Sequence, residues 1–258
     1  TTRRRRAAYS QMPRCCCLLL AALLWLPSLA ATAEIDALRQ VSVGYYEFPP
    51  YTYTDTEGRS VGATLDLLRR LLDKAGYRSE FRGLPSARLY AGLRDGSVHI
   101  WPGVAGKEVL RDQVLESNRE LGKLDLVLYR RPGMPALKLP EELAGRSVIV
   151  ISGYTYFKPF SDWLQDPRLN LRLHSTSSHG AALEMLQRHR GDLLLDYRTP
   201  VELVRRQLDI PPMPYQVLYR LTAKLIFSNK APNAVALRDA LDQAYEQLQA
   251  EGEDLRLY

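Results

Sequence analysis

From residue 40 onward, short apolar stretches typical of β-strands alternate with stretches whose apolar residues recur at helical spacing. The order is strand, helix, strand, helix, strand; after a link it begins again at Ser147, and a further link leads to a C-terminal helix. Alternation of this kind builds mainly parallel sheets that are covered by helices. The order therefore predicts two α/β lobes.

The expected element boundaries follow from apolar periodicity and from residues that start or stop helices. Strands are expected at 41–46, 77–83, 98–101, 124–129, 147–151, 169–173, 192–197 and 217–227. Ser86 is expected to cap the second helix, which Gly96 would close. Thr199 is expected to cap a later helix, with Pro200 at its first position. Trp101 is expected in the core, because its strand is central.

The N-terminal 33 residues have the pattern of a secretory signal. Arginines precede an uninterrupted apolar run at residues 15–26, and the small-x-small sequence Ala31-Thr32-Ala33 follows it. A membrane span needs about 20 apolar residues, so this run is short for a permanent anchor. We expect cleavage between Ala33 and Glu34 and export to the periplasm. Met12 is an alternative start, which would make residues 1–11 an upstream extension.

Charge and cysteine are concentrated in that same segment. The formal net charge of the whole chain is +6, and five of its arginines lie within residues 1–33, where there is no acid. Without that segment the net charge is +1, so a nucleic-acid partner is not expected. All three cysteines, Cys15, Cys16 and Cys17, also lie there. The remaining chain has no thiol, which suits an oxidising compartment.

No cofactor or metal site is predicted from motifs. The four histidines do not form a metal-ligand pattern, and they have no cysteine partner. The chain has no nucleophile elbow, no phosphate-binding P-loop and no dinucleotide-binding glycine pattern. No pair of carboxylates stands out as a catalytic dyad. The sequence therefore gives no catalytic residue.

Ligand-binding residues are expected where strands end, because open parallel sheets bind ligands outside the carboxyl ends of their strands. The segments 45–51, 103–111, 153–156 and 196–198 each follow a predicted strand. They supply aromatic rings, backbone donors, an acid and Arg111, which could hold a carboxylate through two parallel hydrogen bonds. Arg111 could equally be a solvated surface charge, and Asp196 could cap the following helix instead of meeting a ligand.

Several of these segments resemble the periplasmic solute-binding proteins of family 3, the polar amino-acid type. The first is Tyr46-Glu47-Phe48-Pro49-Pro50-Tyr51, followed by Gly58 and by Val61-Gly62-Ala63-Thr64-Leu65-Asp66-Leu67. The second is Leu84-Pro85-x-x-Arg88, and the third runs from Pro140 to Val148 and continues into Ile151-Ser152-Gly153-Tyr154-Thr155. The similarity covers residues 40–258, and the order of the motifs is more specific than any one of them.

The resemblance implies a two-lobed clamp of type II, with mainly parallel sheets joined by two crossover strands. Lobe one would comprise residues 34–130 and 220–258, and lobe two residues 131–219. A solute would bind in the cleft, and the lobes would close over it by a hinge motion. The partners would be a small-molecule solute and an inner-membrane permease or sensor, and the protein would be a monomer.

The resemblance also implies ligand-binding residues. Arg111 falls on the family's carboxylate-binding arginine, and Phe48 on its stacking aromatic residue. Asp196, or its neighbour Tyr197, falls near the acid that binds an α-amine. The remaining positions implied are Tyr45, Arg88, Gly103, Val104, Gly106, Tyr154 and Thr155. Where the family often has Ser or Thr, this chain has Val104, Ala105, Gly106 and Lys107.

Two function classes follow. The first is an exported, non-enzymatic binding protein for a small polar, carboxylate-bearing solute, an amino acid or a related compound, which it delivers to a transporter or sensor. The second is an exported dehydratase of the cyclohexadienyl or prephenate type on the same fold. In that case a cleft acid such as Glu184 or Asp196 would donate the proton.

Overall fold

The computed structural model describes residues 39–257. They contain a mixed sheet of nine strands. Eight of these follow the order β4-β1-β5-β11-β7-β10-β8-β9, and the ninth, β6, pairs with β11. The strands of this sheet are β1 (Gln40–Tyr45), β4 (Arg78–Gly83), β5 (Ile100–Val104), β6 (Val114–Glu116), β7 (Gly122–Arg130), β8 (Ser147–Ile151), β9 (Arg172–Thr176), β10 (Leu193–Tyr197) and β11 (Tyr215–Ser228). A small hairpin pairs β2 (Tyr53–Thr54) with β3 (Ser60–Val61). The α-helices are α3 (Ala63–Lys74), α4 (Ser86–Asp95), α5 (Phe160–Gln165), α6 (His179–Gln187), α7 (Arg198–Gln207) and α8 (Ala234–Ala250).

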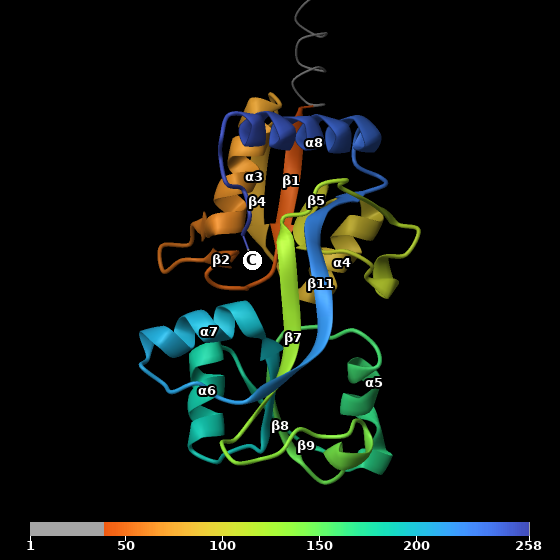
Figure 1. Cartoon of the computed structure of the whole chain (residues 1–258). Coiled ribbons are helices and arrows are strands. Elements are labelled where there is room, and N and C mark those ends of the chain that lie inside the picture. The colour runs from red at the N-terminus through yellow and green to blue at the C-terminus, as the bar shows by residue number, and fades with distance from the viewer. Residues whose placement is uncertain (1–38, 258) are drawn as a thin grey trace, which may run out of the picture. The chain divides into compact units, whose positions relative to one another are not determined.

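The strands form two parallel groups that two long strands connect. In one group β1 pairs in parallel with β4 and β5, and in the other β8 pairs in parallel with β9 and β10. Strands β7 and β11 pair antiparallel with each other and run from one group to the other (Figure 1). We call β1–β6 with α3, α4 and α8 lobe one, and β8–β10 with α5, α6 and α7 lobe two. The predicted mixed α/β clamp with two crossover strands is confirmed.

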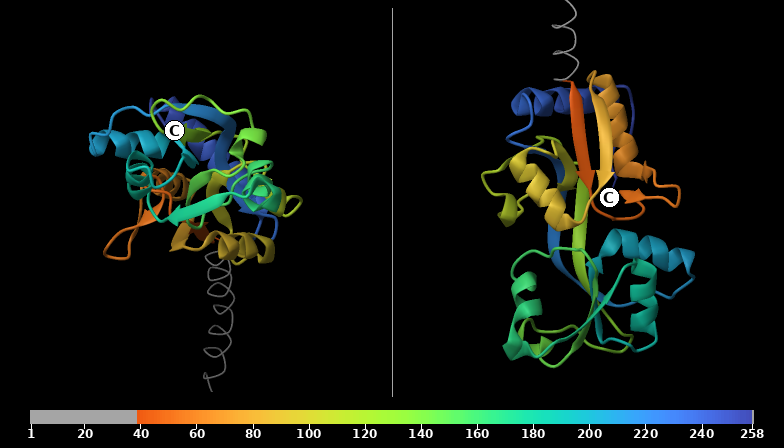
Figure 2. Two further views of the ribbon diagram at one scale, coloured as in Figure 1. Left: turned by 90° about the horizontal axis from the view of Figure 1, so that it is seen from below. Right: turned by 180° about the vertical axis from the view of Figure 1, so that it is seen from behind.

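Helices cover both lobes, and the view from behind shows β7 and β11 passing between the two groups (Figure 2). Helix α3 forms because Leu65, Leu68 and Leu72 repeat at helical spacing and all three are buried. Helix α4 ends at Gly96, whose left-handed backbone (φ 89°) lets its N–H bond to the Gly92 carbonyl. The predicted stop at Gly96 is therefore confirmed, but the helix begins differently: Pro85 is the N-cap, and Ser86 is the first helical residue.

Two further boundaries differ in kind from the sequence prediction, and the other predicted strands begin and end within three residues of their expected bounds. The strand expected at 169–173 begins later, as β9 (Arg172–Thr176), because Pro167–Leu169 form a 3-10 turn and Asn170 is left-handed with φ 44°. Helix α7 begins at Arg198, after the N-cap Tyr197, so Thr199 does not cap it. Strand β8 has the predicted bounds.

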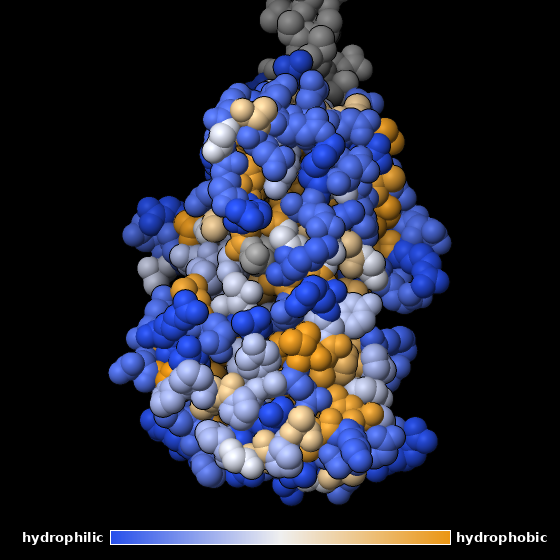
Figure 3. All heavy atoms as spheres, viewed as in Figure 1, coloured by the Kyte–Doolittle hydropathy of each residue, from blue (hydrophilic) through white to orange (hydrophobic). Residues whose placement is uncertain are grey.

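Apolar side chains form two buried clusters. The larger one includes Phe48 and Trp101 of lobe one and continues to Phe160 and Tyr197 of lobe two. The smaller one lies within lobe two, between its strands and α6. The face seen in Figure 3 is hydrophilic over most of its area, and its exposed apolar side chains gather mainly toward its lower half.

Within residues 39–257, the structure contains no helix with the length and apolar character needed to cross a bilayer. The predicted signal, its cleavage site and the alternative start at Met12 lie outside the described residues.

Candidate functional site

A cleft separates the strand ends of the two lobes, and chain segments that follow β1, β4, β5 and β8 line it. Its largest cavity has a volume of about 510 Å³ and is lined by Ser86, Ala87, Tyr90, Arg94, Gly106, Lys107, Glu108, Val109, Thr155, Tyr156, Phe157, Lys158 and Ser161. A second cavity of about 260 Å³ is lined by Tyr46, Glu47, Gly83, Leu84, Pro85, Ser86, Ser152, Gly153 and Tyr154. Both cavities have walls from both lobes, and Ser86 lines both. The cleft is therefore the place where a small molecule could contact both lobes at once.

Lys107, which follows β5, reaches across the cleft. Its side-chain Nζ donates to the Thr155 carbonyl at 2.8 Å and lies 3.0 Å from Thr155 Oγ1. The same atom lies 4.1 Å from the centre of the Phe157 ring, which is within the range of a cation–π contact. Burial lowers the pKa of Lys107 to about 8. Lobe one thus places a buried amine against a lobe-two loop, in the largest cavity.

Tyr90 of α4 forms a second polar contact between the lobes. Its hydroxyl lies 2.9 Å from Thr155 Oγ1. Burial raises the pKa of Tyr90 to about 12, so the phenol stays protonated at neutral pH. Thr155 is therefore held by Lys107 and Tyr90, and both bonds would break if the lobes separated.

Aromatic rings fill the centre of the cleft. Phe48 of lobe one contacts the rings of Tyr154 and Tyr197 of lobe two, with centroid distances of 5.7 and 5.4 Å. Tyr46 lies between Trp101 and Tyr154, at 5.8 and 6.1 Å. The space left among these rings is only about 20 Å³. A ligand of amino-acid size fits the two cavities beside this cluster, but not its interior.

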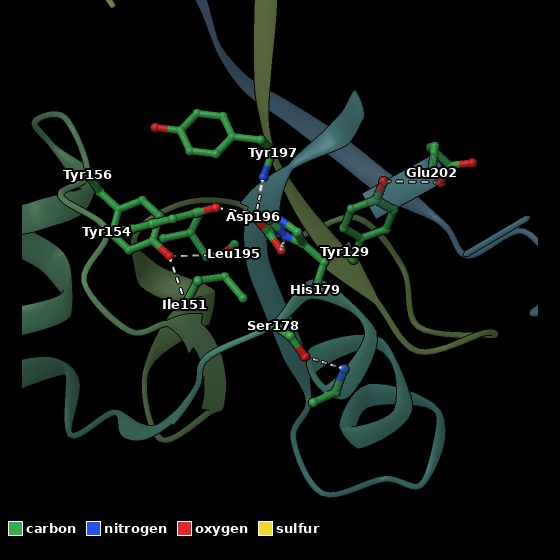
Figure 4. Close-up of polar contacts among 11 residues, drawn as sticks. Tyr129, Ile151, Tyr154, Tyr156, Ser178, His179, Leu195, Asp196, Tyr197 and Glu202 are labelled. Carbon is green, nitrogen blue, oxygen red and sulfur yellow. Dashed lines mark hydrogen bonds and ion pairs between the residues drawn. The ribbon is translucent and has the colours of Figure 1, made fainter. Parts of the chain in front are cut away.

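A buried chain of hydrogen bonds leads from Asp196 through His179 to the hydroxyl of Tyr154, on the side of Tyr154 away from the cleft cavities (Figure 4). His179 is the first residue of α6, and its Nδ1 lies 2.7 Å from Asp196 Oδ2. The His179 Nε2 atom is 3.3 Å from the Tyr154 hydroxyl. Asp196 is completely buried and also accepts the Tyr197 backbone N–H at 2.7 Å. Burial raises the pKa of Asp196, and the contact with His179 opposes that effect.

The structure brings four of the residues predicted as ligand-binding to the cleft and places a fifth behind them. Phe48 and Tyr154 meet in the ring cluster, Thr155 and Gly106 line the largest cavity, and Asp196 lies behind Tyr154. Asp196 differs from the expectation, because its carboxylate is bonded to His179 and Tyr197 inside lobe two. It therefore does not face the cleft as a partner for a ligand amine.

Three predicted residues lie elsewhere. The side chain of Arg111 is 67% exposed and pairs with Glu108. The 3-10 turn Glu108–Leu110 buries Leu110, which turns the next residue outward. Tyr45 is buried in lobe one, where its hydroxyl bonds to Ser60 Oγ at 2.7 Å. Arg88 is exposed on α4 and lines neither of the two cleft cavities.

Gly103 and Val104 belong to β5 and line the small space in the ring cluster. A Cβ atom on Gly103 would lie 2.0 Å from the Trp101 indole ring. Glycine is therefore needed there to let Trp101 fold over the strand. Trp101 is 1% exposed, which confirms its predicted place in the core.

The sequence did not predict Lys107, Tyr90 or His179 as site residues. Lys107 stands where the family often has Ser or Thr. This difference from the family pattern was the one sequence feature that indicated an amine in the cleft. His179 and Asp196 are 17 residues apart and lie on different elements, so no local motif joins them. No group of three or more histidine, aspartate or glutamate side chains in residues 39–257 has the geometry of a metal site.

Comparisons with known proteins identify the family of this chain and its fold. The model of the bacterial extracellular solute-binding proteins, family 3, matches residues 41–258. The chain belongs to that family. No curated protein shows significant sequence similarity to it.

Solved structures with the same fold include proteins of several kinds. A substrate-binding protein of an ABC uptake transporter from Streptococcus pneumoniae with bound histidine has a TM-score of 0.66 at 17% identity, covering 87% of this chain and 93% of its own. A histidine kinase sensor domain similar to periplasmic binding proteins has a TM-score of 0.65 at 20% identity, covering 83% and 92%. The ancestral amino acid-binding protein AncCDT-1, a precursor of cyclohexadienyl dehydratase, has a TM-score of 0.64 at 16% identity, covering 86% and 94%.

The family match identifies the chain as a solute-binding protein of family 3. The solved structures are 20% identical or less, so they show only that the fold is shared.

Proposed function

We propose that this family 3 protein binds a small carboxylate-bearing solute between its lobes, in the periplasm, and presents it to a membrane transporter or sensor without chemical change. The observation that carries the proposal is the cavity of about 510 Å³, which has walls from both lobes and contains the buried amine of Lys107. A solute that contacts both walls adds interactions between the lobes and so favours their closed arrangement.

In this proposal Lys107 takes the carboxylate-binding role that the family resemblance implied for Arg111. An ammonium group that is buried beside neutral oxygens gains a counter-charge when a carboxylate enters the cavity. Arg111 has its own carboxylate partner and is mostly exposed, so its contribution to binding is small.

The two acids considered as proton donors for the dehydratase alternative lie outside the cleft cavities. Asp196 is held by His179, and Glu184 lies on α6 with its side chain 48% exposed, 3.5 Å from Arg188. Neither residue lines the two cleft cavities. The acids that do line the cavities, Glu108 and Glu47, are bound to Arg111 and Thr54. Incubation with prephenate and arogenate is therefore expected to give no turnover, and the appearance of an aromatic product would reject a purely binding role.

A thermal-unfolding screen with amino acids, organic acids and polyamines tests the proposal. A ligand present at 100 times its dissociation constant adds about 2.7 kcal/mol to the free energy of unfolding. Small-angle scattering with a stabilising compound should then show a smaller radius of gyration or no change, and expansion would contradict closure.

The matched variants are Ser86→Phe, which places a ring where the two cavities meet, and Ser175→Phe on the exposed side of β9. The first should abolish the ligand-induced stabilisation and the second should preserve it. If no compound of any class stabilises the wild-type protein, the proposed function fails.

A further inference from the structure

Lys107 is a buried cation without a carboxylate partner. Its residue is 9% exposed, and its polar contacts are to the neutral oxygens of Thr155. In residues 39–257 no carboxylate lies within ion-pair distance of its Nζ. A buried charge in this condition is costly, and an anion brought to it from solution would offset that cost. An ammonium has three N–H donors, and Thr155 accepts two of them, which leaves one for a ligand.

The carboxylates around the cleft are already bound to groups of the protein. Asp196 is held by His179, as described above. Glu47 accepts from the backbone N–H and the hydroxyl of Thr54, at 3.0 and 2.9 Å. Glu108 pairs with Arg111. A ligand ammonium entering the cleft would therefore share an acid with the partner that acid already has, whereas a ligand carboxylate meets Lys107, which has no acidic partner in the described part of the chain.

The remaining charges of the largest cavity favour an anion too. Arg94 lines it, and none of the described carboxylates forms an ion pair with Arg94. Lys158 lines it as well and pairs with Asp162. The first turn of α4 faces the cavity through Ser86 and Ala87, and its N-cap, Pro85, supplies no side-chain acceptor. The unsatisfied N–H groups of that turn carry partial positive charge.

Apolar and aromatic groups form much of the remaining cavity wall. They are Ala87, Tyr90, Val109, Tyr156 and Phe157. The Phe157 ring is itself stacked on Tyr219, with an interplanar angle of 11° and a centroid distance of 6.1 Å, so its orientation is supported from the other side. Rigid ring faces beside a cation suit a ligand with a flat apolar body and one anionic end.

We infer that the solute is a carboxylate on a flat apolar body that lacks an α-ammonium group, with its carboxylate bound to Lys107. This inference rests on the proposed function and narrows it. It separates this chain from an amino-acid binder by the charges of the cleft, in which Lys107 and Arg94 have no acidic partner among the described residues and each acid has a hydrogen-bond partner.

Three compounds with one carbon skeleton test the inference at pH 7. They are 3-phenylpropionate, which has only the carboxylate, L-phenylalanine, which has both groups, and 2-phenylethylamine, which has only the ammonium. Isothermal titration of the full chain should give at least about tenfold tighter binding for 3-phenylpropionate than for L-phenylalanine, and no heat for the amine. Lys107→Gln should weaken 3-phenylpropionate binding by at least about tenfold. Lys138→Gln, at an exposed lysine outside the cavity, should leave it unchanged.

Each contrary result has a definite meaning. Equal or tighter binding of L-phenylalanine, or an undiminished affinity in Lys107→Gln, overturns the inference and leaves solute binding in the cleft intact. The same holds if another amino acid binds and 3-phenylpropionate does not. A folding defect in Lys107→Gln, seen by circular dichroism, does not remove the test, because the three compounds are compared on the wild-type protein. If neither these compounds nor the wider panel bind, the proposed function itself fails.

Discussion

Raising the pH from 7 to 9 should weaken the binding of a carboxylate by about tenfold. The cause is the ammonium of Lys107, whose pKa burial lowers from 10.5 to about 8 in the unliganded protein. Only the protonated form attracts the anion, so the apparent dissociation constant grows with the fraction of neutral amine. The apparent dissociation constant is about 1.1 times that of the fully protonated protein at pH 7 and about 11 times that value at pH 9. This tenfold change corresponds to a loss of about 1.4 kcal/mol of binding free energy.

Lys107 should also make the stability of the unliganded protein depend on pH, but in the opposite direction: stability rises with pH, whereas carboxylate binding weakens. The folded pKa lies below the unfolded value, so between about pH 8 and 10.5 the unfolded chain binds more protons than the folded one. The contribution of Lys107 to the free energy of unfolding therefore rises with pH across that window. The other titratable or charged groups facing it in the cavity are Tyr90, Arg94, Glu108, Tyr156 and Lys158. Burial raises the pKa of Tyr90 to about 12 and also raises that of Tyr156, so neither phenol titrates below pH 9.

Isothermal titration with 3-phenylpropionate at half-unit steps from pH 6.5 to 9 measures the effect. Lys107→Arg keeps the charge throughout this range, because the guanidinium does not lose its proton, and should give a flat profile. Lys107→Gln should bind weakly at every pH. A wild-type affinity that is constant to pH 9, or one that falls equally in Lys107→Arg, would refute the assignment of the anion to Lys107.

Four other changes have defined outcomes. Arg111→Gln should leave ligand affinity within about twofold of wild type, because its exposed pair with Glu108 contributes little; a loss comparable with that of Lys107→Gln would restore Arg111 to the site. His179→Ala should lower the free energy of urea unfolding by about 3–5 kcal/mol, since Asp196 would stay buried without its partner; a loss below about 1 kcal/mol would show that the pair is dispensable. Gly103→Ala should cost about 1–3 kcal/mol and alter tryptophan fluorescence, because the added methyl meets the Trp101 ring, whereas Gly180→Ala in α6 has ordinary contacts and should be neutral or stabilising. Tyr90→Phe removes the bond to Thr155 but keeps the ring, and small-angle scattering should show a larger radius of gyration for the unliganded protein; an unchanged radius would mean that this bond does not hold the lobes together.

The fold was predictable because strands and helices leave periodic signals. The apolar run at Ser147–Ile151 gave β8 its bounds, and the left-handed Gly96 closed α4 where expected. Errors arose where a turn overrides periodicity. Leu169 and Leu171 suggested a strand, but the chain forms a 3-10 turn and a left-handed residue there before β9 begins.

The position of the candidate site in the fold was predictable, but the directions of its side chains were not. Strand ends and family motifs pointed to Phe48, Gly106, Tyr154 and Thr155, which do meet at the cleft. Arg111 was predicted from a family resemblance, which gives a position along the chain and not the direction of a side chain. The turn at Glu108–Leu110 directs Leu110 inward and Arg111 outward.

The pairing of His179 with Asp196 depends on tertiary packing between α6 and β10, which leaves no local pattern in the sequence.

The central claim is that both lobes contact one solute, and hydrogen exchange tests it most directly. With saturating 3-phenylpropionate, the backbone amides of Ser86 and Ala87 in lobe one and of Thr155–Lys158 in lobe two should exchange more slowly together. Protection of only one of these segments, or protection confined to other parts of the chain, would contradict it.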